Sequence, residues 1–218
     1  MAKQNEHGKL IAAAARAALA PLGCRRKGQS RVWFSDERFW YILIEFQPSA
    51  WSKGTYLNVT PIWLFLRPWG GEAAHRVSNY ITFESSSQFG PLIEQAAQRV
   101  AAEVVSLRAK FRTPADLHRF FAGNPSWSGN IYRAAITGGL VGDFALARQL
   151  FARVGALDPA KQGSRFKDIR EECATMAGLL DDPAAYRSAI LERIAARRQK
   201  LGLPVDAQCL ETARLGPD

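Results

Sequence analysis

The stretch Phe39-Trp40-Tyr41-Ile42-Leu43-Ile44-Glu45-Phe46 decides the fold class, because it is apolar at nearly every position. Eight residues rich in aromatic and β-branched side chains, preceded by the turn sequence Ser35-Asp36-Glu37, are typical of a β-strand. Apolar residues at both alternating sets of positions predict a central strand that is covered on both faces. The preceding segment, residues 25–34, predicts a basic loop that leads into a neighbouring strand at Trp33-Phe34.

Two further segments extend this sheet. Residues 56–66 predict a third strand, in which Pro61 lacks an N–H group and therefore predicts a bulge or an edge position. The breaker sequence Arg67-Pro68-Trp69-Gly70-Gly71 follows, and alternation resumes at residues 77–83 as a fourth strand. We expect an antiparallel meander of about four strands.

Helical periodicity flanks the sheet. The first helix is predicted from apolar residues near helical spacing: Leu10, Ile11, Ala14, Ala18 and Leu22. Ala18-Leu19-Ala20 also imitates a signal-peptide cleavage site, but Arg16 interrupts the apolar run, so we favour the helix. A long helix is expected near Pro91, with an apolar stripe over residues 93–111 that covers one face of the sheet.

A shorter helix is expected from Pro114, and Gly123-Asn124-Pro125 ends it. We place a domain boundary there, with an α+β domain at residues 1–122 and a helical domain at residues 123–218. In the second domain, helix start and stop signals predict helices at residues 131–141, 144–154, 166–180 and 183–201. The fold class is therefore α+β, with an all-helical C-terminal part.

The first helical pair resembles the second half of a tetratricopeptide repeat, through Gly142-Asp143-Phe144, Ala147, Phe151 and Asp158-Pro159. The preceding helix departs from that family, because the large aromatic residues, Leu and Gly that are usual there are replaced by Ile131, Ala134, Ala135 and Gly138. A single repeat is also too short for a peptide-binding solenoid. We interpret the pair as a packed helical hairpin.

The first third of the chain resembles a bacterial family, domain of unknown function 4304. The likeness rests on short features in the same order: Leu22-Gly23, Arg26-Lys27-Gly28, Trp33-Phe34, Gln47 with Ser49, and Leu57-Asn58-Val59. The resemblance implies an α+β fold with a helix packed on an antiparallel sheet. It implies no catalytic residues.

Composition restricts the environment and the partners. The 218 residues are 47% hydrophobic and carry a formal charge of +9. Residues 1–122 hold 16 Lys and Arg against 9 Asp and Glu, so most of the excess lies in the first part. Such a basic surface attracts nucleic acid or acidic proteins. Three distant cysteines suit reduced thiols, and no apolar run spans a bilayer, so we expect a cytoplasmic protein and no membrane partner.

Catalytic, metal and cofactor motifs are not found in the sequence. His7, His75 and His118 lie in different expected elements without acidic or histidine neighbours at ligand spacing. The glycines of residues 138–142 lack the Gly-Lys-Ser/Thr ending of a phosphate loop and predict a helix-hairpin turn. The pairs Glu171-Glu172 and Asp181-Asp182 should diverge. We therefore expect no metal and no cofactor, and lean against an enzyme.

Two groups of residues are candidates for a binding surface. The first combines the cations Arg25, Arg26, Lys27 and Arg31 with the aromatic residues Trp33, Phe34, Trp40 and Trp51. This mixture could bind single-stranded nucleic acid by charge neutralisation and stacking. The alternative, which we favour, is that the aromatic residues are core and the cations a solvated edge.

The second group gathers around one strand connection and contains Gln47, Ser49, Trp51, Lys53 and Asn58. It could form a recognition surface on a loop held by the sheet, or its Gln47 and Asn58 could satisfy backbone groups of a turn or bulge. Trp69, Gly70, Gly71 and His75 form a neighbouring loop that could close over it.

The sequence favours a non-enzymatic protein-interaction module that binds an acidic protein partner rather than nucleic acid. Its helical half would extend that surface or support a homodimer. A bacterial immunity or defence accessory would fit this description by analogy. A nucleic-acid-binding protein is the first alternative, and an enzyme with a pocket lined by Trp51, Trp69 and His75 is the second.

Overall fold

A computed structural model of the chain describes residues 6–67, 75–125 and 128–211. Contacts divide the chain into two compact units: residues 1–62 with 72–109, here called the sheet unit, and residues 63–71 with 110–218, here called the helical unit. These units do not coincide with the expected domains. Trp63 belongs to the helical unit because its ring packs edge-on against Phe111 and Phe121.

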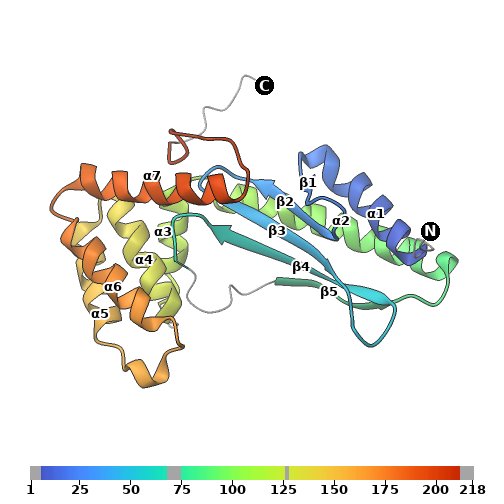
Figure 1. Cartoon of the computed structure of the whole chain (residues 1–218), viewed down its shortest axis with the longest axis horizontal. Coiled ribbons are helices and arrows are strands. Elements are labelled where there is room, and N and C mark those ends of the chain that lie inside the picture. Colours follow the sequence, from blue (N-terminus) through green and yellow to red (C-terminus); the bar gives the residue numbers. More distant parts are fainter. Residues whose placement is uncertain (1–5, 68–74, 126–127, 212–218) are drawn as a thin grey trace. The chain divides into compact units, whose positions relative to one another are not determined.

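The sheet unit contains a five-stranded antiparallel meander, which confirms the α+β prediction (Figure 1). Its strands follow in chain order: β1 Arg25–Arg26, β2 Val32–Asp36, β3 Trp40–Gln47, β4 Gly54–Trp63 and β5 His75–Thr82. Four of them were expected. The additional strand, β1, lies in the segment that the sequence predicted as a basic loop, and it pairs Arg26 with Trp33 of β2.

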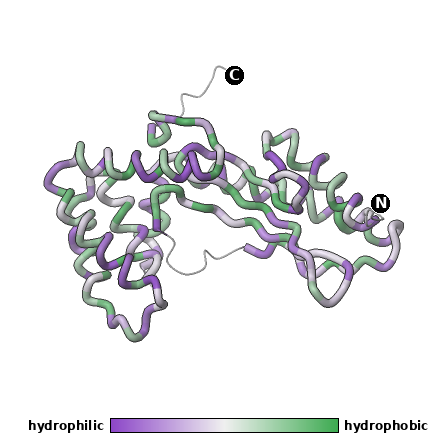
Figure 2. The backbone as a smooth tube through the Cα atoms, viewed as in Figure 1, coloured by the Kyte–Doolittle hydropathy of each residue, from purple (hydrophilic) through white to green (hydrophobic). Residues whose placement is uncertain are grey.

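Burial along β3 corrects the expectation of a strand covered on both faces. Trp40, Ile42, Ile44 and Phe46 are buried, whereas the residues between them are half-buried. The strand is central, because it lies between β2 and β4, but only one face is fully covered. Figure 2 shows apolar residues along β3 and β4. Pro61 lies beyond the last described pair of β4 with β5, which joins Val59 to His75.

The described part of the sheet unit also contains two helices and one helical turn: α1 Glu6–Leu19, η1 Ala20–Leu22 and α2 Ser86–Lys110. The segment that resembled a signal peptide is helix α1. Helix α2 begins five residues before Pro91, because the Ser85 carbonyl already accepts from the amide of Phe89. The two helices contact each other, since the ring of His7 packs against Phe89.

Arg108 near the end of α2 joins three parts of the sheet unit. Its Nε donates to Glu37 at 2.7 Å, and its Nη2 donates to Ser35 Oγ at 2.5 Å and to the Leu22 carbonyl at 2.9 Å. Ser35 is buried and also donates to Glu37. A guanidinium with three acceptors fixes α2 against β2 and η1.

Where the structure describes the helical unit, it has five α-helices and a helical turn: α3 Pro114–Ala122, α4 Ser128–Val141, α5 Phe144–Gly155, η2 Pro159–Lys161, α6 Phe166–Gly178 and α7 Pro183–Lys200. Thr113 and Asp116 form a capping box at the start of α3. Gly142 turns the chain between α4 and α5 with φ of 84°, a left-handed conformation that favours glycine. The helical hairpin was therefore predicted correctly. No helix within the described ranges is long and apolar enough to cross a membrane.

His7 should make the stability of the sheet unit pH-dependent. Its side chain is buried, and Arg31 Nη2 donates to its Nε2 at 2.8 Å. Burial lowers the pKa of His7 below its usual value of 6.5, and the nearby charges of Arg31 and Lys53 lower it further. As the pH falls through 6.5, His7 therefore binds a proton more readily in the unfolded chain than in the folded chain. We expect the free energy of unfolding to fall as the pH drops from 7.5 through 6.5 to 5.

Urea denaturation at several pH values checks this prediction. The variant His7→Gln should show a flatter pH dependence between 7.5 and 5 than the parent chain. The matched control is His75→Gln, because the side chain of His75 is 64% exposed, and it should keep the slope of the parent. Equal slopes in all three proteins would contradict the assignment.

Candidate functional site

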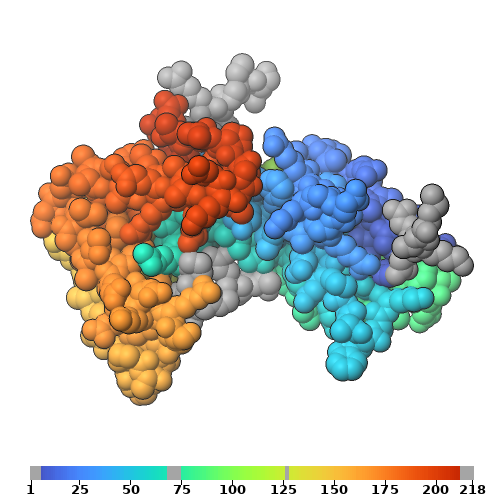
Figure 3. Space-filling model, in the orientation of Figure 1, coloured from blue at the N-terminus to red at the C-terminus, as the bar shows by residue number. Residues whose placement is uncertain are grey.

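The connection between β3 and β4 forms an exposed hairpin with Trp51 near its tip. Trp51 is 96% exposed, the highest value among the exposed large apolar side chains of the described residues. The loop is held in place around it. The amide of Trp51 donates to Ser49 Oγ at 3.1 Å. The hydroxyl of Tyr80 on β5 donates to the Ser52 carbonyl at 2.8 Å and accepts from the Ser52 hydroxyl. Figure 3 shows the hairpin (cyan) projecting from the sheet unit.

Gly54 allows β4 to approach β5 closely where the hairpin rejoins the sheet. A Cβ at this position would lie 2.2 Å from the Ile81 carbonyl oxygen and 2.7 Å from the Tyr80 ring. Only glycine fits that approach without a shift of the backbone. The Phe83 amide donates to the Lys53 carbonyl at 2.9 Å, which ties the hairpin to the end of β5.

Gln47 and Asn58 face each other across β3 and β4. The Asn58 amide is buried and donates to Gln47 Oε1 at 2.8 Å, and Thr55 Oγ1 donates to the Gln47 carbonyl at 3.2 Å. The pairing of β4 with β5 shifts register between Thr55 and Asn58. These contacts favour the interpretation that the two amides stabilise an irregular part of the sheet.

The basic segment lies at the same end of the sheet as the hairpin. The amide of Lys27 donates to the Val32 carbonyl, and the amide of Phe46 donates to the Arg31 carbonyl, so the turn at residues 27–31 lies beside the end of β3. Arg25 and Lys27 are exposed. Arg26 is used internally, since its guanidinium donates to the carbonyls of Ser30 and Gln29 at 2.7 and 2.9 Å.

The proposed stacking platform for nucleic acid does not form. Trp33 and Trp40 are 5% and 1% exposed, so both belong to the core. Phe34 is half-buried, which leaves Trp51 as the exposed aromatic side chain of that group. Bases cannot stack on rings that lie inside the protein.

His75 lies away from the hairpin. The register of β4 with β5 pairs Gly54 with Thr82 at the hairpin end and Val59 with His75 at the other. His75 Nδ1 instead lies 3.4 Å from Glu103 Oε1 of α2. Trp69 lies outside the described residues, as do Gly70 and Gly71. Trp51 and His75, the two described residues of the expected pocket with Trp69, therefore do not come together to form it.

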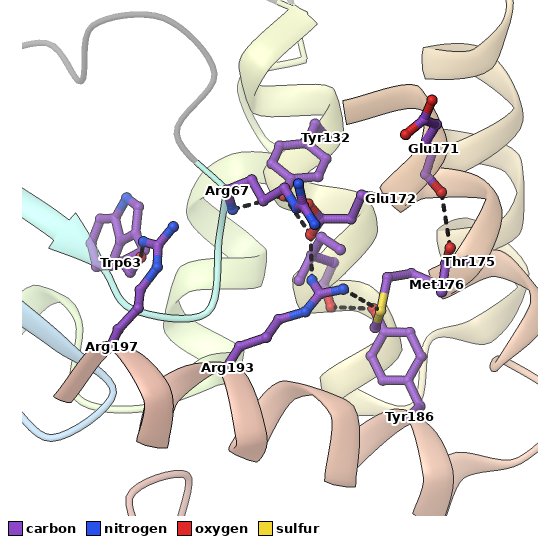
Figure 4. Close-up of polar contacts among 11 residues, drawn as sticks. Trp63, Arg67, Tyr132, Glu171, Glu172, Thr175, Met176, Tyr186, Arg193 and Arg197 are labelled. Carbon is purple, nitrogen blue, oxygen red and sulfur yellow. Dashed lines mark hydrogen bonds and ion pairs between the residues drawn. The ribbon is translucent and has the colours of Figure 1, made fainter. Parts of the chain in front are cut away.

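The helical unit contains a polar centre that the sequence did not predict, built on the buried side chain of Glu172 (Figure 4). Glu172 Oε1 accepts from Tyr132 Oη at 2.8 Å and from Nη1 of Arg193, and its Oε2 lies 2.9 Å from Nε of Arg67. The backbone amide of Arg67 donates to Tyr132 Oη at 3.0 Å. Glu171 points away and is exposed, as expected for adjacent residues of a helix.

A cavity of about 410 Å³ opens beside this centre, between α6, α7 and residues 64–67. This cavity is here called the basic cleft. Its polar wall consists of five cations and one carboxylate: Arg67, Arg165, Arg193, Arg197, Lys200 and Asp168. Three of the cations stand at positions 193, 197 and 200 of α7. That i, i+4, i+7 spacing places them on one helix face and is the sequence signal that could have found the cleft.

The groups around Glu172 are suited to holding charge rather than to proton transfer. Burial, followed by the charge of Glu172, raises the pKa of Tyr132 well above its usual value, so its hydroxyl stays protonated. The same two causes raise the pKa of Cys173 to about 12, which keeps its thiol unreactive near neutral pH. Within the ranges that the structure describes, no cluster of three His, Cys, Asp or Glu could hold a metal ion.

Comparison of the chain with protein-family models, with curated proteins and with solved structures gave no match. The resemblance of the first third to domain of unknown function 4304 stays a prediction.

Proposed function

We propose that this chain is a non-enzymatic protein-interaction module that binds an acidic protein partner through the hairpin end of its sheet. The observation that carries the proposal is Trp51, a large aromatic side chain that is 96% exposed on a loop held by hydrogen bonds to Ser49 and Tyr80. Tryptophan is enriched among the residues that dominate binding energy at interfaces.

The charges around Trp51 favour an acidic partner. Lys53 follows it in the hairpin and Lys27 lies in the neighbouring turn, and both are exposed. A cationic rim around an aromatic anchor speeds association with a negatively charged surface and selects against basic partners. A hairpin that is already ordered loses little conformational entropy on binding.

Nucleic acid is disfavoured as the partner by the burial of Trp33 and Trp40. Among Trp33, Phe34, Trp40 and Trp51, only the Trp51 ring is exposed, and it offers one stacking position. Single-strand binding surfaces stack successive bases.

The prediction is that Trp51→Ala weakens partner binding by about 30-fold or more, corresponding to about 2 kcal/mol. The immobilised full-length chain is used to capture proteins from extract of the source cells, and the affinity of the purified partner is then measured by biolayer interferometry. The charge-reversal variant Lys27→Glu/Lys53→Glu should lower the association rate and make it less sensitive to salt.

Val205→Ala serves as the matched control, because Val205 is also apolar and 86% exposed but lies in the helical unit. It should bind like the parent chain. The proposal fails if the captured protein is basic, if Trp51→Ala leaves its affinity unchanged, or if oligonucleotides bind with a salt-sensitive affinity that Lys27→Glu/Lys53→Glu abolishes.

A further inference from the structure

The basic cleft of the helical unit is distinct from the hairpin end of the sheet, and we propose that it binds a small organic phosphate monoester. The cleft lies wholly within the helical unit, on α6, α7 and residues 64–67. Its volume of about 410 Å³ falls in the range of pockets that hold small molecules.

The charge of the cleft requires a counter-charge. Five cations line it, and the carboxylates that face them are Asp168 in the wall and Glu172 beneath it, which leaves a formal excess of three positive charges. The side chains of Arg165 and Lys200 form no ion pair with a residue in the described ranges. Like charges held together repel, so a bound anion would stabilise this arrangement.

The guanidinium groups are already positioned for a ligand. Arg193 is held by Glu172 and by the Met176 sulfur at 3.2 Å, and Arg197 Nη1 donates to the Trp63 carbonyl at 3.2 Å. Figure 4 shows Arg67 and Arg193 converging on Glu172. Arg67 pairs with Glu172 through Nε, and its two terminal nitrogens donate to no residue that the structure describes. Cations fixed in this way lose little side-chain entropy when an anion binds.

The chemistry of the cleft fits a phosphate monoester better than other anions. A phosphate monoester carries between one and two negative charges at pH 7 and presents three acceptor oxygens, and guanidinium groups match such oxygens in bidentate fashion. The remaining wall of the cleft is apolar and includes Leu64, Ile169 and Ala196. These side chains would cover the organic part of a ligand, which inorganic phosphate lacks.

Isothermal titration calorimetry with the full-length chain tests the proposal, using phenyl phosphate and inorganic phosphate as the probes. We expect one saturable site for phenyl phosphate, with an affinity about tenfold higher than that for inorganic phosphate because of the buried ring. The variant Arg165→Gln/Lys200→Gln removes two exposed cations of the cleft and should weaken phenyl phosphate binding about tenfold while the chain stays folded.

The control Arg153→Gln/Arg170→Gln removes the same charge from exposed positions on α5 and α6 that do not line the cleft. It should bind like the parent chain. The absence of saturable binding would overturn the proposal, as would equal loss of affinity in both double variants. Equal affinities for inorganic phosphate and phenyl phosphate would show that the cleft does not select a monoester. Circular dichroism of each variant establishes that it is folded.

Discussion

Replacing Glu172 with glutamine should lower the free energy of unfolding by about 3 kcal/mol, because breaking a buried ion pair leaves charges without a partner. The Glu172 side chain is 1% exposed and meets both Arg67 and Arg193. Glutamine keeps the size of the side chain and one carbonyl oxygen but removes the negative charge. Arg67 is 57% exposed and Arg193 27% exposed, so partial rehydration of both places the effect at the lower end of the usual range for buried pairs.

Glu171→Gln is the matched control for this prediction, because Glu171 is the neighbouring residue of α6 and is exposed. It removes the same charge from the same helix turn, and we expect a change within about 0.5 kcal/mol. Urea denaturation followed by far-ultraviolet circular dichroism measures both variants. Similar small effects for the two substitutions would mean that the Glu172 centre contributes little to the stability of the helical unit.

Replacing Gly139 with alanine should lower the free energy of unfolding by about 2 to 3 kcal/mol, the usual effect of overpacking a core. A Cβ at Gly139 of α4 would lie 2.3 Å from Cζ of Tyr186 on α7, well inside contact distance. The Tyr186 ring has little freedom to move, since it is fully buried and its hydroxyl donates to the Ile136 carbonyl at 2.9 Å. The steric effect therefore exceeds the gain of about 1 kcal/mol in helix propensity.

Gly178→Ala provides the control, because a Cβ at Gly178 of α6 meets no atom within 4 Å. Helix propensity then acts alone, and we expect stability to be unchanged or raised by up to about 1 kcal/mol. Thermal denaturation of the two variants checks the difference in sign. If Gly139→Ala also stabilised the chain, the close contact between α4 and α7 would not be present in solution.

The pair Gly138-Gly139 illustrates what sequence patterns can and cannot settle. The missing Gly-Lys-Ser/Thr ending argued against a phosphate loop, and the segment indeed lies in helix α4 and its turn. The sequence placed the whole glycine run in the turn, whereas only Gly142 adopts the left-handed conformation there. Gly139 is instead needed for helix packing, and that role depends on Tyr186, which lies 47 positions away in the chain.

The candidate binding surface was partly predictable. Loop composition drew attention to Trp51 and Lys53, and both are exposed on the hairpin. Trp33 and Trp40 could not be assigned from composition, because an aromatic residue in a strand is compatible with either face. Trp51 and His75 were grouped because both flank β4, yet the antiparallel register places them at opposite ends of that strand.

The sequence by itself determined the α+β class, the antiparallel order of the main strands, the ends of α3 and the turn of the helical hairpin. Each depends on local signals: alternation with period 2, helical periodicity, Pro114 at a helix start, and Gly142-Asp143 between helices. Only the tertiary structure decided that β3 is fully covered on one face, that Trp63 packs with Phe111, and that Glu172 meets Arg67, Arg193 and Tyr132. Those contacts join residues up to 105 positions apart, and the partner of a buried charge is fixed by helix packing, which local patterns do not encode.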